Sequence, residues 1–276
     1  MNVRIFHGSN QVDAVAADDR GLAYGDGVFE TIRVHRGGMP WWDAHWARLL
    51  RGSERLGLAL PDQHQVREQA RLMFGDGADG VLKLIVTRGG GARGYAPSAS
   101  AQPHWLLSRH PLPARSDGPA HGDGLHLHGC STRMATQPVL AGIKHCNRLE
   151  QVLARAECVA AGKDEGLLCD AEGWVVAATS ANVFVLHAGQ WTTPLLDQCG
   201  VAGTCRAQLL APLHAHEGRL RPADVEAADA VFLCNAVRGI LPVASLGARV
   251  WQPHPALAQA CQVLAALHPG FAPETE

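Results

Sequence analysis

The run Leu140-Ala-Gly-Ile-Lys-His-Cys-Asn-Arg-Leu-Glu-Gln-Val-Leu-Ala-Arg155 contains Lys144, one of only three lysines in the chain. A short apolar stretch with a glycine precedes Lys144, and a strong helix pattern follows it directly. This placement predicts a partly desolvated amine, whose neutral form is a nucleophile or a base. A covalently bound aldehyde cofactor needs such an amine. Taken alone, the pattern fits an ordinary half-buried cation better, so the remaining sequence has to decide.

The composition describes a folded protein with a well-filled interior. Of the 276 residues 47% are hydrophobic and 18% charged, and the formal net charge is −2. This charge gives no electrostatic case for nucleic acid or an anionic membrane as a partner. The chain has no long uncharged apolar run, and its first residues lack the apolar centre of a signal peptide. The eight cysteines show no metal or disulfide spacing. We therefore expect a soluble cytoplasmic protein with reduced thiols.

A stretch rich in proline and glycine divides the chain. We expect an N-terminal α+β domain over residues 1–110, a linker over 111–122 and a C-terminal domain over 123–276. Two lobes of this kind favour a ligand site in a cleft at the domain boundary.

The apolar periodicity predicts helices and strands in both domains. Asp43 and Thr204 are expected to cap helices, and a further helix is expected to start at Pro61-Asp62. Leu149, Val152, Leu153 and Ala156 form an apolar stripe on a further helix. A last helix covers 255–267. The predicted strands cover 28–35, 81–87, 104–108, 125–131, 166–169, 175–176, 182–186 and 230–234.

Gly89-Gly-Gly-Ala-Arg-Gly94 matches the dinucleotide-binding pattern G-x-G-x-x-G after a predicted strand. That function needs a helix to begin there, and the continuation Tyr95-Ala-Pro-Ser-Ala-Ser cannot propagate one. We interpret the run as a flexible loop that carries Arg88 and Arg93 toward an anionic group. A plain exposed hairpin loop is the alternative.

Two further patterns concern metals and anions. His126 and His128 share one strand face, but without a third ligand at a suitable spacing a solvated face is favoured, and we expect no metal. The turn Gly200-Val-Ala-Gly-Thr-Cys-Arg206 leads into a helix, and Cys234-Asn-Ala-Val-Arg238 follows a strand. Both turns suit a phosphate group, although either is also compatible with a structural turn. No H-E-x-x-H, G-x-S-x-G or Walker A sequence is present.

Four segments together resemble the fold-type IV pyridoxal-phosphate enzymes, and within them the 4-amino-4-deoxychorismate lyases. Asp19-Arg-Gly-Leu-Ala-Tyr-Gly-Asp-Gly-Val-Phe-Glu30 is similar to the N-terminal signature of that family. Arg48 occupies the place of an arginine that contacts the cofactor phosphate. Thr87-Arg-Gly-Gly-Gly-Ala-Arg-Gly-Tyr95 resembles the substrate loop of the lyases. Ala141-Gly-Ile-Lys-His-Cys-Asn-Arg-Leu-Glu-Gln-Val-Leu153 resembles their cofactor-lysine motif, which is the most specific of the four.

The resemblance implies a two-lobed α+β fold with a smaller N-terminal lobe and a larger C-terminal lobe with a mixed β core. It implies pyridoxal 5'-phosphate as cofactor, a small-molecule substrate and a homodimer. The implied reaction converts 4-amino-4-deoxychorismate to 4-aminobenzoate and pyruvate, which feeds folate synthesis. Lys144 would form the Schiff base and act in catalysis with Thr31, which orients the leaving group. The expected cofactor contacts are Arg48, the amides of Val201 and Ala202, Asn235 and Ala236. Arg88, Arg93 and Tyr95 are expected at the substrate.

The sequence departs from the family pattern at Ala177, where a glutamate normally pairs with the cofactor's ring nitrogen. A carboxylate there keeps the nitrogen protonated, and this makes the cofactor a strong electron sink. Thr179 or Ser180 can hydrogen-bond a neutral nitrogen instead. Loss of the carboxylate harms a transaminase more than a lyase, whose product gains aromaticity. A transaminase of the same fold acting on D- or branched-chain amino acids, and a non-catalytic member of the family, remain the alternatives.

Overall fold

The structure is a computed structural model that describes residues 3–91, 94–98, 101–113 and 124–272. The chain divides into two compact units. Unit 1 comprises Met1–Leu112 together with Ile143–Asn147, and unit 2 comprises Pro113–Gly142 and Arg148–Glu276. Most of the expected linker lies outside the described residues. The segment 143–147, which contains Lys144, belongs to unit 1 although the residues on both sides of it belong to unit 2.

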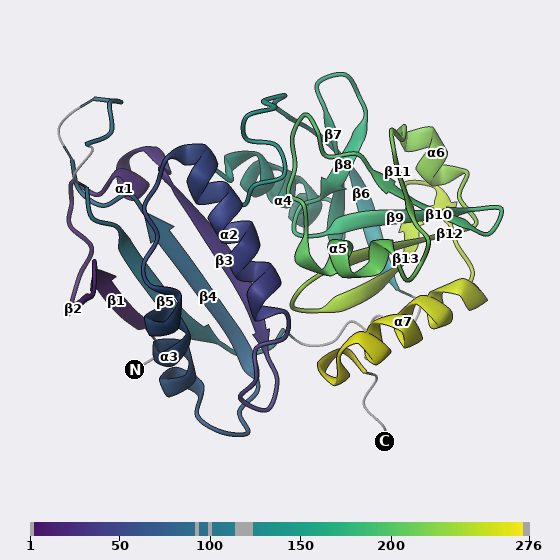
Figure 1. Cartoon of the computed structure of the whole chain (residues 1–276). Helices are drawn as coiled ribbons and strands as arrows, with labels where there is room; N and C mark the ends of the chain where they lie inside the picture. The colour runs from purple at the N-terminus through teal and green to yellow at the C-terminus, as the bar shows by residue number, and fades with distance from the viewer. Residues whose placement is uncertain (1–2, 92–93, 99–100, 114–123, 273–276) are drawn as a thin grey trace. The chain divides into compact units, whose positions relative to one another are not determined.

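Unit 1 is built on an antiparallel sheet of five strands in the order β2-β1-β5-β4-β3 (Figure 1). The strands are β1 Val3–His7, β2 Asn10–Val12, β3 Gly27–Val34, β4 Gly80–Thr87 and β5 His104–His110. The helices are α1 Arg20–Tyr24, α2 Trp42–Leu56 and α3 Gln63–Phe74.

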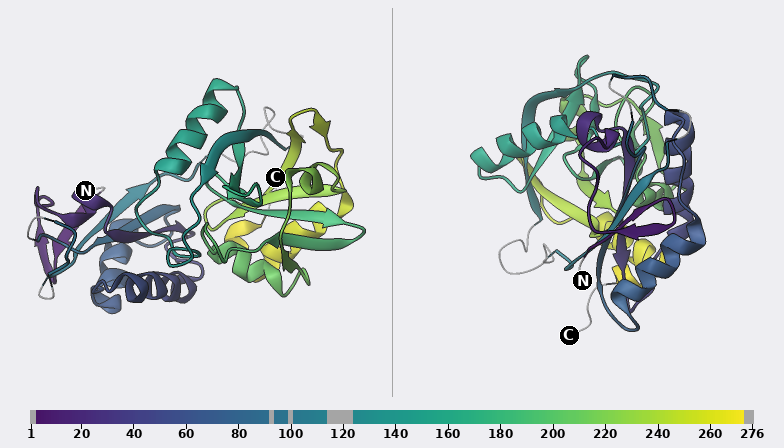
Figure 2. Two further views of the ribbon diagram at one scale, coloured as in Figure 1. Left: turned by 90° about the horizontal axis from the view of Figure 1, so that it is seen from above. Right: turned by 90° about the vertical axis from the view of Figure 1, so that its left-hand side faces the viewer.

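Helices α2 and α3 lie on one face of this sheet (Figure 2). The two-residue alternation of β3 explains this arrangement. Val28, Ile32 and Val34 are buried beneath the helices, whereas Phe29 and Thr31 point to the opposite face and are only half-buried. The buried side chains of the helix-covered face, including Trp105 of β5, form one hydrophobic cluster.

The expected starts of the two longer helices turn out differently. Asp62 caps α3, because its carboxylate accepts a hydrogen bond of 2.8 Å from the Gln65 amide. The prediction for Asp43 is wrong. The chain enters α2 through Trp41 in the left-handed conformation (φ 55°), and Asp43 lies inside the first turn. A carboxylate there still interacts favourably with the helix dipole.

Unit 2 contains a mixed sheet of nine strands in the order β11-β10-β9-β12-β13-β6-β7-β8, with β14 paired to β13. Strand β6 lies parallel to both β13 and β7. The strands are β6 Leu125–Met134, β7 Glu165–Asp170, β8 Val175–Ala178, β9 Asn182–His187, β10 Gln190–Pro194, β11 His216–Gly218, β12 Ala230–Asn235, β13 Gly239–Leu246 and β14 Arg249–Val250. The helices are α4 Leu149–Ala160, α5 Thr204–Leu210, α6 Pro222–Glu226, α7 Pro255–Leu267 and the 3-10 turn η1 Pro269–Phe271. This confirms the α+β class and the mixed β core of the C-terminal part.

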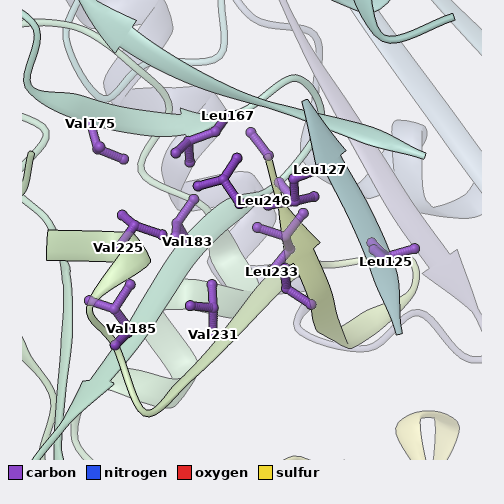
Figure 3. Close-up of a cluster of buried hydrophobic side chains, with 14 of the residues drawn as sticks. Leu125, Leu127, Leu167, Val175, Val183, Val185, Val225, Val231, Leu233 and Leu246 are labelled. Carbon is purple, nitrogen blue, oxygen red and sulfur yellow. The ribbon is translucent and has the colours of Figure 1, made fainter. Parts of the chain in front are cut away.

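The main core of unit 2 gathers side chains from many strands (Figure 3). Leu127 of β6, Val183 of β9 and Leu233 of β12 are fully buried there. Continuous apolar runs in β9 and β12 are typical of strands covered on both faces, and both strands are almost wholly buried. Ala177 of β8 belongs to a separate cluster that α4 covers with Ala154 and Cys158.

Helix α4 exposes its apolar stripe. Leu149 is 77% exposed, and Val152 and Leu153 are each 60% exposed. The buried residues of α4 are small ones, Ala154 and Cys158.

No helix of the described part of the chain is long and apolar enough to cross a membrane.

Candidate active site

Lys144 is held by backbone pairing to the outer edge of β3. The Phe29 amide donates to the Lys144 carbonyl at 2.9 Å, and the Cys146 amide donates to the Gly27 carbonyl at 2.9 Å. His145 forms an antiparallel bridge with Val28 between these two bonds. Because β3 ends the strand order of its sheet, this short segment satisfies backbone groups that an edge strand otherwise leaves open.

Two glycines of the Asp19–Glu30 signature allow this close approach. Gly25 adopts the left-handed conformation (φ 64°), and a Cβ there would lie 2.6 Å from Asn147 Oδ1. The Asn147 side chain donates to the Gly25 carbonyl at 3.1 Å. A Cβ on Gly27 would lie 2.6 Å from the Val86 carbonyl oxygen and 3.3 Å from Cys146 Sγ. The signature therefore provides the surface on which the lysine segment rests.

The Lys144 side chain lies over the sheet face that the helices leave uncovered. Its Nζ is 4.2 Å from the centroid of the Phe29 ring, and the Lys83 Nζ is 5.6 Å from the same centroid. Thr31 is directly opposite Lys83 in the β3–β4 ladder, so both side chains share this face with Phe29. Ile143 is 2% exposed. The structure thus brings Lys144 and Thr31, the two expected catalytic residues, to one face of one sheet.

Arg48 of α2 is part of a buried charge cluster on the helix-covered side of β3. Its Nε donates to Glu30 Oε1 at 2.7 Å and its Nη2 to Glu30 Oε2 at 2.5 Å, and His45 Nδ1 bonds Glu30 Oε2 at 2.6 Å. Burial by itself raises the pKa of Glu30, but the charges of Arg48 and His45 outweigh it and lower that pKa to about 2. Glu30 thereby fixes the guanidinium plane.

Arg88 has a different environment from the one expected. Its Nε and Nη2 donate to Asp26 at 2.8 and 3.1 Å, and its guanidinium also donates to the carbonyls of Leu56 and Gly57. Arg88 is 8% exposed. The Arg88 guanidinium thus links Asp26, just before β3, to the C-terminal end of α2 at Leu56 and Gly57. Because its N–H groups are used within unit 1, we do not retain Arg88 as a ligand of substrate carboxylates.

Arg20 was not singled out from the sequence, yet it anchors the expected substrate loop. Its Nε donates to Asp26 at 2.9 Å, and its two other nitrogens donate to the Gly94 and Tyr95 carbonyls at 2.8 Å each. Tyr95 itself is 85% exposed. Arg93 lies outside the described residues. Burial raises the pKa of Asp26, but the hydrogen bonds and charges of Arg88 and Arg20 outweigh it and lower that pKa. The sequence signal for this role of Arg20 is that it and Asp26 lie in the same signature, Asp19–Glu30.

In unit 2 the first expected phosphate turn is tied to the residue that precedes the lysine segment. The Ala202 amide donates to the Gly142 carbonyl at 3.0 Å, and the Gly142 amide donates to the Gly200 carbonyl at 2.9 Å. The Asn182 side chain donates to the Val201 carbonyl at 2.9 Å. The Ala202 amide is thus already used within the protein, which weakens its assignment as a phosphate donor.

The helix after this turn offers better donors. The expected cap Thr204 is wrong, because Gly203 is the N-cap and Thr204 is the first residue of α5. Thr204 is 4% exposed, and its hydroxyl has no hydrogen-bond partner among the residues that the structure describes. The amides of a first helical turn also lack intrahelical acceptors. A buried hydroxyl without a partner costs free energy, so an anionic ligand oxygen at this turn would fit.

The second expected phosphate turn is shaped by Asn235 at the end of β12. Asn235 Oδ1 accepts hydrogen bonds from the amides of Val237 and Arg238 at 3.0 and 2.8 Å. Its Nδ2 donates to the Ser180 carbonyl at 3.4 Å. Ala236 is almost fully buried. The side chain of Asn235 therefore builds the turn, and it joins the turn to the segment that follows β8.

The two histidines considered as a metal pair have protein partners. His126 Nδ1 bonds Ser245 Oγ at 2.8 Å, and His128 Nε2 lies 3.6 Å from Glu157 Oε2. No group of three or more metal-ligating side chains occurs in the described part of the chain.

Comparison with known proteins places these features in context. A family model described as amino-transferase class IV matches residues 27–246. The crystal structure of a 4-amino-4-deoxychorismate lyase from Pseudomonas aeruginosa is 40% identical, has a TM-score of 0.85 and covers 95% of this chain and 98% of its own.

Two curated sequences are similar over most of the chain. An aminodeoxychorismate lyase from Vibrio harveyi is 34% identical over 239 residues, or 85% of this chain and 88% of the relative. A putative branched-chain-amino-acid aminotransferase from Methanocaldococcus jannaschii is 32% identical over 249 residues, or 86% of this chain and 84% of the relative.

The buried pair of Glu30 and Arg48 generates a prediction about stability. We expect Glu30→Gln to lower the free energy of unfolding at neutral pH by about 3 kcal/mol, since a buried cation loses its partner. The folded-state pKa of Glu30 is lowered from 4.5 to about 2. Its contribution is therefore complete above pH 4.5 and is lost as pH falls toward 2.

Urea unfolding of both proteins between pH 7 and pH 2 measures this contribution. Asp197→Asn is the control, because its ion pair with Arg219 is well exposed and is expected to contribute less than about 1 kcal/mol. Equal losses in the two variants would contradict the prediction.

Proposed function

The chain belongs to the class IV aminotransferase family, and from this we propose that it is a lyase that converts 4-amino-4-deoxychorismate to 4-aminobenzoate and pyruvate. The cofactor of the family is pyridoxal 5'-phosphate. Two lyases with similar sequences, at 34% and 40% identity over most of the chain, support this reaction. The observation that carries the proposal is the half-buried Lys144 amine above Phe29, which is fixed in register by the edge of β3.

The residues of this chain fit the cofactor at two places. Lys144 would hold it covalently through Nζ. Thr204 and the first amides of α5, together with Arg48 and the turn at Asn235–Ala236, would hold its phosphate. When bound, pyridoxal phosphate supplies an electron sink for the carbon that carries the substrate amine.

The substrate amine would displace Lys144 Nζ, and the freed amine would then move the protons of the reaction. It would take a proton from the ring carbon that bears the amine and return one to the departing enolpyruvyl group, which leaves as pyruvate. The substrate ring becomes aromatic in the same reaction, so no further reactant is needed. Thr31 shares the sheet face of Lys144 and Phe29 and would orient the leaving group. Arg93 and Tyr95 remain the proposed loop contacts of the substrate.

We also propose that the protein is a homodimer, and the exposed apolar stripe of α4 supports this. Leu149, Val152, Leu153 and Val159 are 60% to 77% exposed along one helix. Contiguous exposed apolar side chains of this kind mark interaction sites on soluble proteins.

A transaminase of the same family is the second candidate, because the relative from Methanocaldococcus jannaschii has that name at 32% identity. The two reactions differ in what they release.

The role of Lys144 is tested by Lys144→Ala. We expect the variant to lose the visible absorption band of the lysine-bound cofactor and at least a thousandfold of 4-aminobenzoate release, because removing a covalent catalytic group abolishes its chemistry. Lys163→Ala is the matched control and should keep both. A wild-type protein that stays colourless with added cofactor would refute the cofactor assignment.

The reaction itself is tested by giving the purified protein two substrates separately. We expect 4-aminobenzoate and pyruvate in equal amounts from 4-amino-4-deoxychorismate, measured by fluorescence and by coupled reduction of pyruvate. Amino transfer from D-alanine or leucine to 2-oxoglutarate should be much slower. Amino transfer without release of 4-aminobenzoate would favour the transaminase.

The dimer is tested by Leu153→Glu on α4. A charge in the centre of an apolar interface is costly because it must be desolvated, so we expect the mass measured by light scattering to fall from that of two chains to that of one. Leu72→Glu on α3, where the leucine is 61% exposed, is the control and should leave the mass unchanged. A monomeric wild-type protein would rule the proposal out.

A further inference from the structure

A buried carboxylate in unit 2 lies beside the expected cofactor contacts. Glu165 of β7 is 5% exposed. It accepts hydrogen bonds from the Gly166 amide at 3.0 Å, the Thr179 amide at 3.1 Å, the Ser180 hydroxyl at 2.6 Å and the Thr179 hydroxyl. All four bonds run from a donor to Glu165, so its carboxylate oxygens act only as acceptors here.

Thr179 and Ser180, which donate to Glu165, belong to the segment between β8 and β9. This segment contacts both of the expected phosphate turns. The Ser180 carbonyl accepts from Asn235, and Asn182, two residues further on, donates to the Val201 carbonyl. Asp170 is the other buried carboxylate of β7, but it accepts from the Glu172 and Trp174 amides in the hairpin turn at the far end of the strand. Glu165 is therefore the carboxylate of β7 at the site end.

The Thr179 side chain lies beside the hydrophobic cluster that contains Ala177. Thr179 lies in the bend that directly follows β8, two residues beyond Ala177. The Thr179 methyl carbon and the Sγ atoms of Cys130 and Cys158 all lie around the place that a Gly166 Cβ would occupy. Ala177 belongs to the same hydrophobic cluster as these two cysteines. The Thr179 hydroxyl thus reaches from the Ala177 side toward Glu165.

The direction of the Thr179 hydrogen bond decides what the hydroxyl can offer a ring nitrogen. A hydroxyl has one proton, and this one is donated to Glu165, so only its oxygen lone pairs remain for a third partner. A hydroxyl that donates to a carboxylate is also a stronger acceptor. A neutral pyridine nitrogen needs a donor, whereas a protonated one needs an acceptor. This geometry selects the protonated form, contrary to the expectation from the sequence.

We propose that Glu165, acting through the Thr179 hydroxyl, replaces the carboxylate that is absent at position 177 and keeps the cofactor's ring nitrogen protonated. Glu165 is in this sense a positioning residue, and Thr179 is the residue that touches the cofactor. The inference rests on the proposed binding of pyridoxal phosphate at Lys144.

The test is the 15N chemical shift of the ring nitrogen in the holoenzyme loaded with 15N-labelled pyridoxal phosphate. The wild-type protein should give the shift of a protonated pyridine nitrogen. Glu165→Gln and Thr179→Val should move it to the unprotonated range, because each removes the hydrogen bond from the Thr179 hydroxyl to the Glu165 carboxylate. Thr179→Ser keeps the hydroxyl and should restore the wild-type shift.

Glu157→Gln is the matched control. Its carboxylate accepts the same kinds of bonds, from the amides and hydroxyls of Ser131 and Thr132, but it has no bond to Thr179. This variant should keep the protonated shift. An unprotonated nitrogen in the wild-type protein, or an unchanged shift in Glu165→Gln, would overturn the inference.

The same wild-type sample separates this inference from the proposed function. A missing absorption band means that the cofactor is not bound at Lys144, and the proposed function fails. A normal band and normal release of 4-aminobenzoate with an unprotonated nitrogen would refute only the role of Glu165.

Discussion

The pairing of residues 144–146 with the edge of β3 is the constraint on which the site depends. Two backbone hydrogen bonds set the register, and a strand's alternation then sends Ile143 and Lys144 to opposite sides. A slip by one residue would bury the lysine and expose the isoleucine. The glycines at positions 25 and 27 are required for the same reason, since a side chain at either would collide with the segment or with β4.

Charge clusters then support this edge at the middle of β3 and just before its first residue. Glu30 holds Arg48 and His45 beneath the strand, and Asp26 holds Arg20 and Arg88 just before it. Each carboxylate lies between two basic side chains and is held ionised by them. The positive groups therefore stabilise unit 1, and Arg20 also holds the loop at Gly94 and Tyr95.

Local patterns predicted much of this structure. The long apolar runs of β4, β9 and β12 predicted buried strands, and Asp62 predicted a helix start, because these signals depend only on neighbouring residues. Arg88 could not be placed this way. A loop arginine can bind a substrate or hold its own loop, and only the distant partner Asp26 decides between them. The cap predictions for Asp43 and Thr204 were wrong for a related reason. The residues that begin these helices are Trp41 and Gly203, whose backbone conformation depends on the fold. The surroundings of Ala177 could not be read from the sequence either, because only the fold brings the Glu165 carboxylate, twelve residues earlier, to the Thr179 hydroxyl.

The membership of residues 143–147 in unit 1 has a consequence for how the protein is made. A ribosome that has released residues 1–112 has delivered every strand of the five-stranded sheet but not the piece that covers the edge of β3. That edge stays open until the chain has grown past residue 147, well into unit 2. Lys144 is thus positioned only after much of unit 2 has been made, so an unfinished chain does not hold the Lys144 amine in place for a free aldehyde.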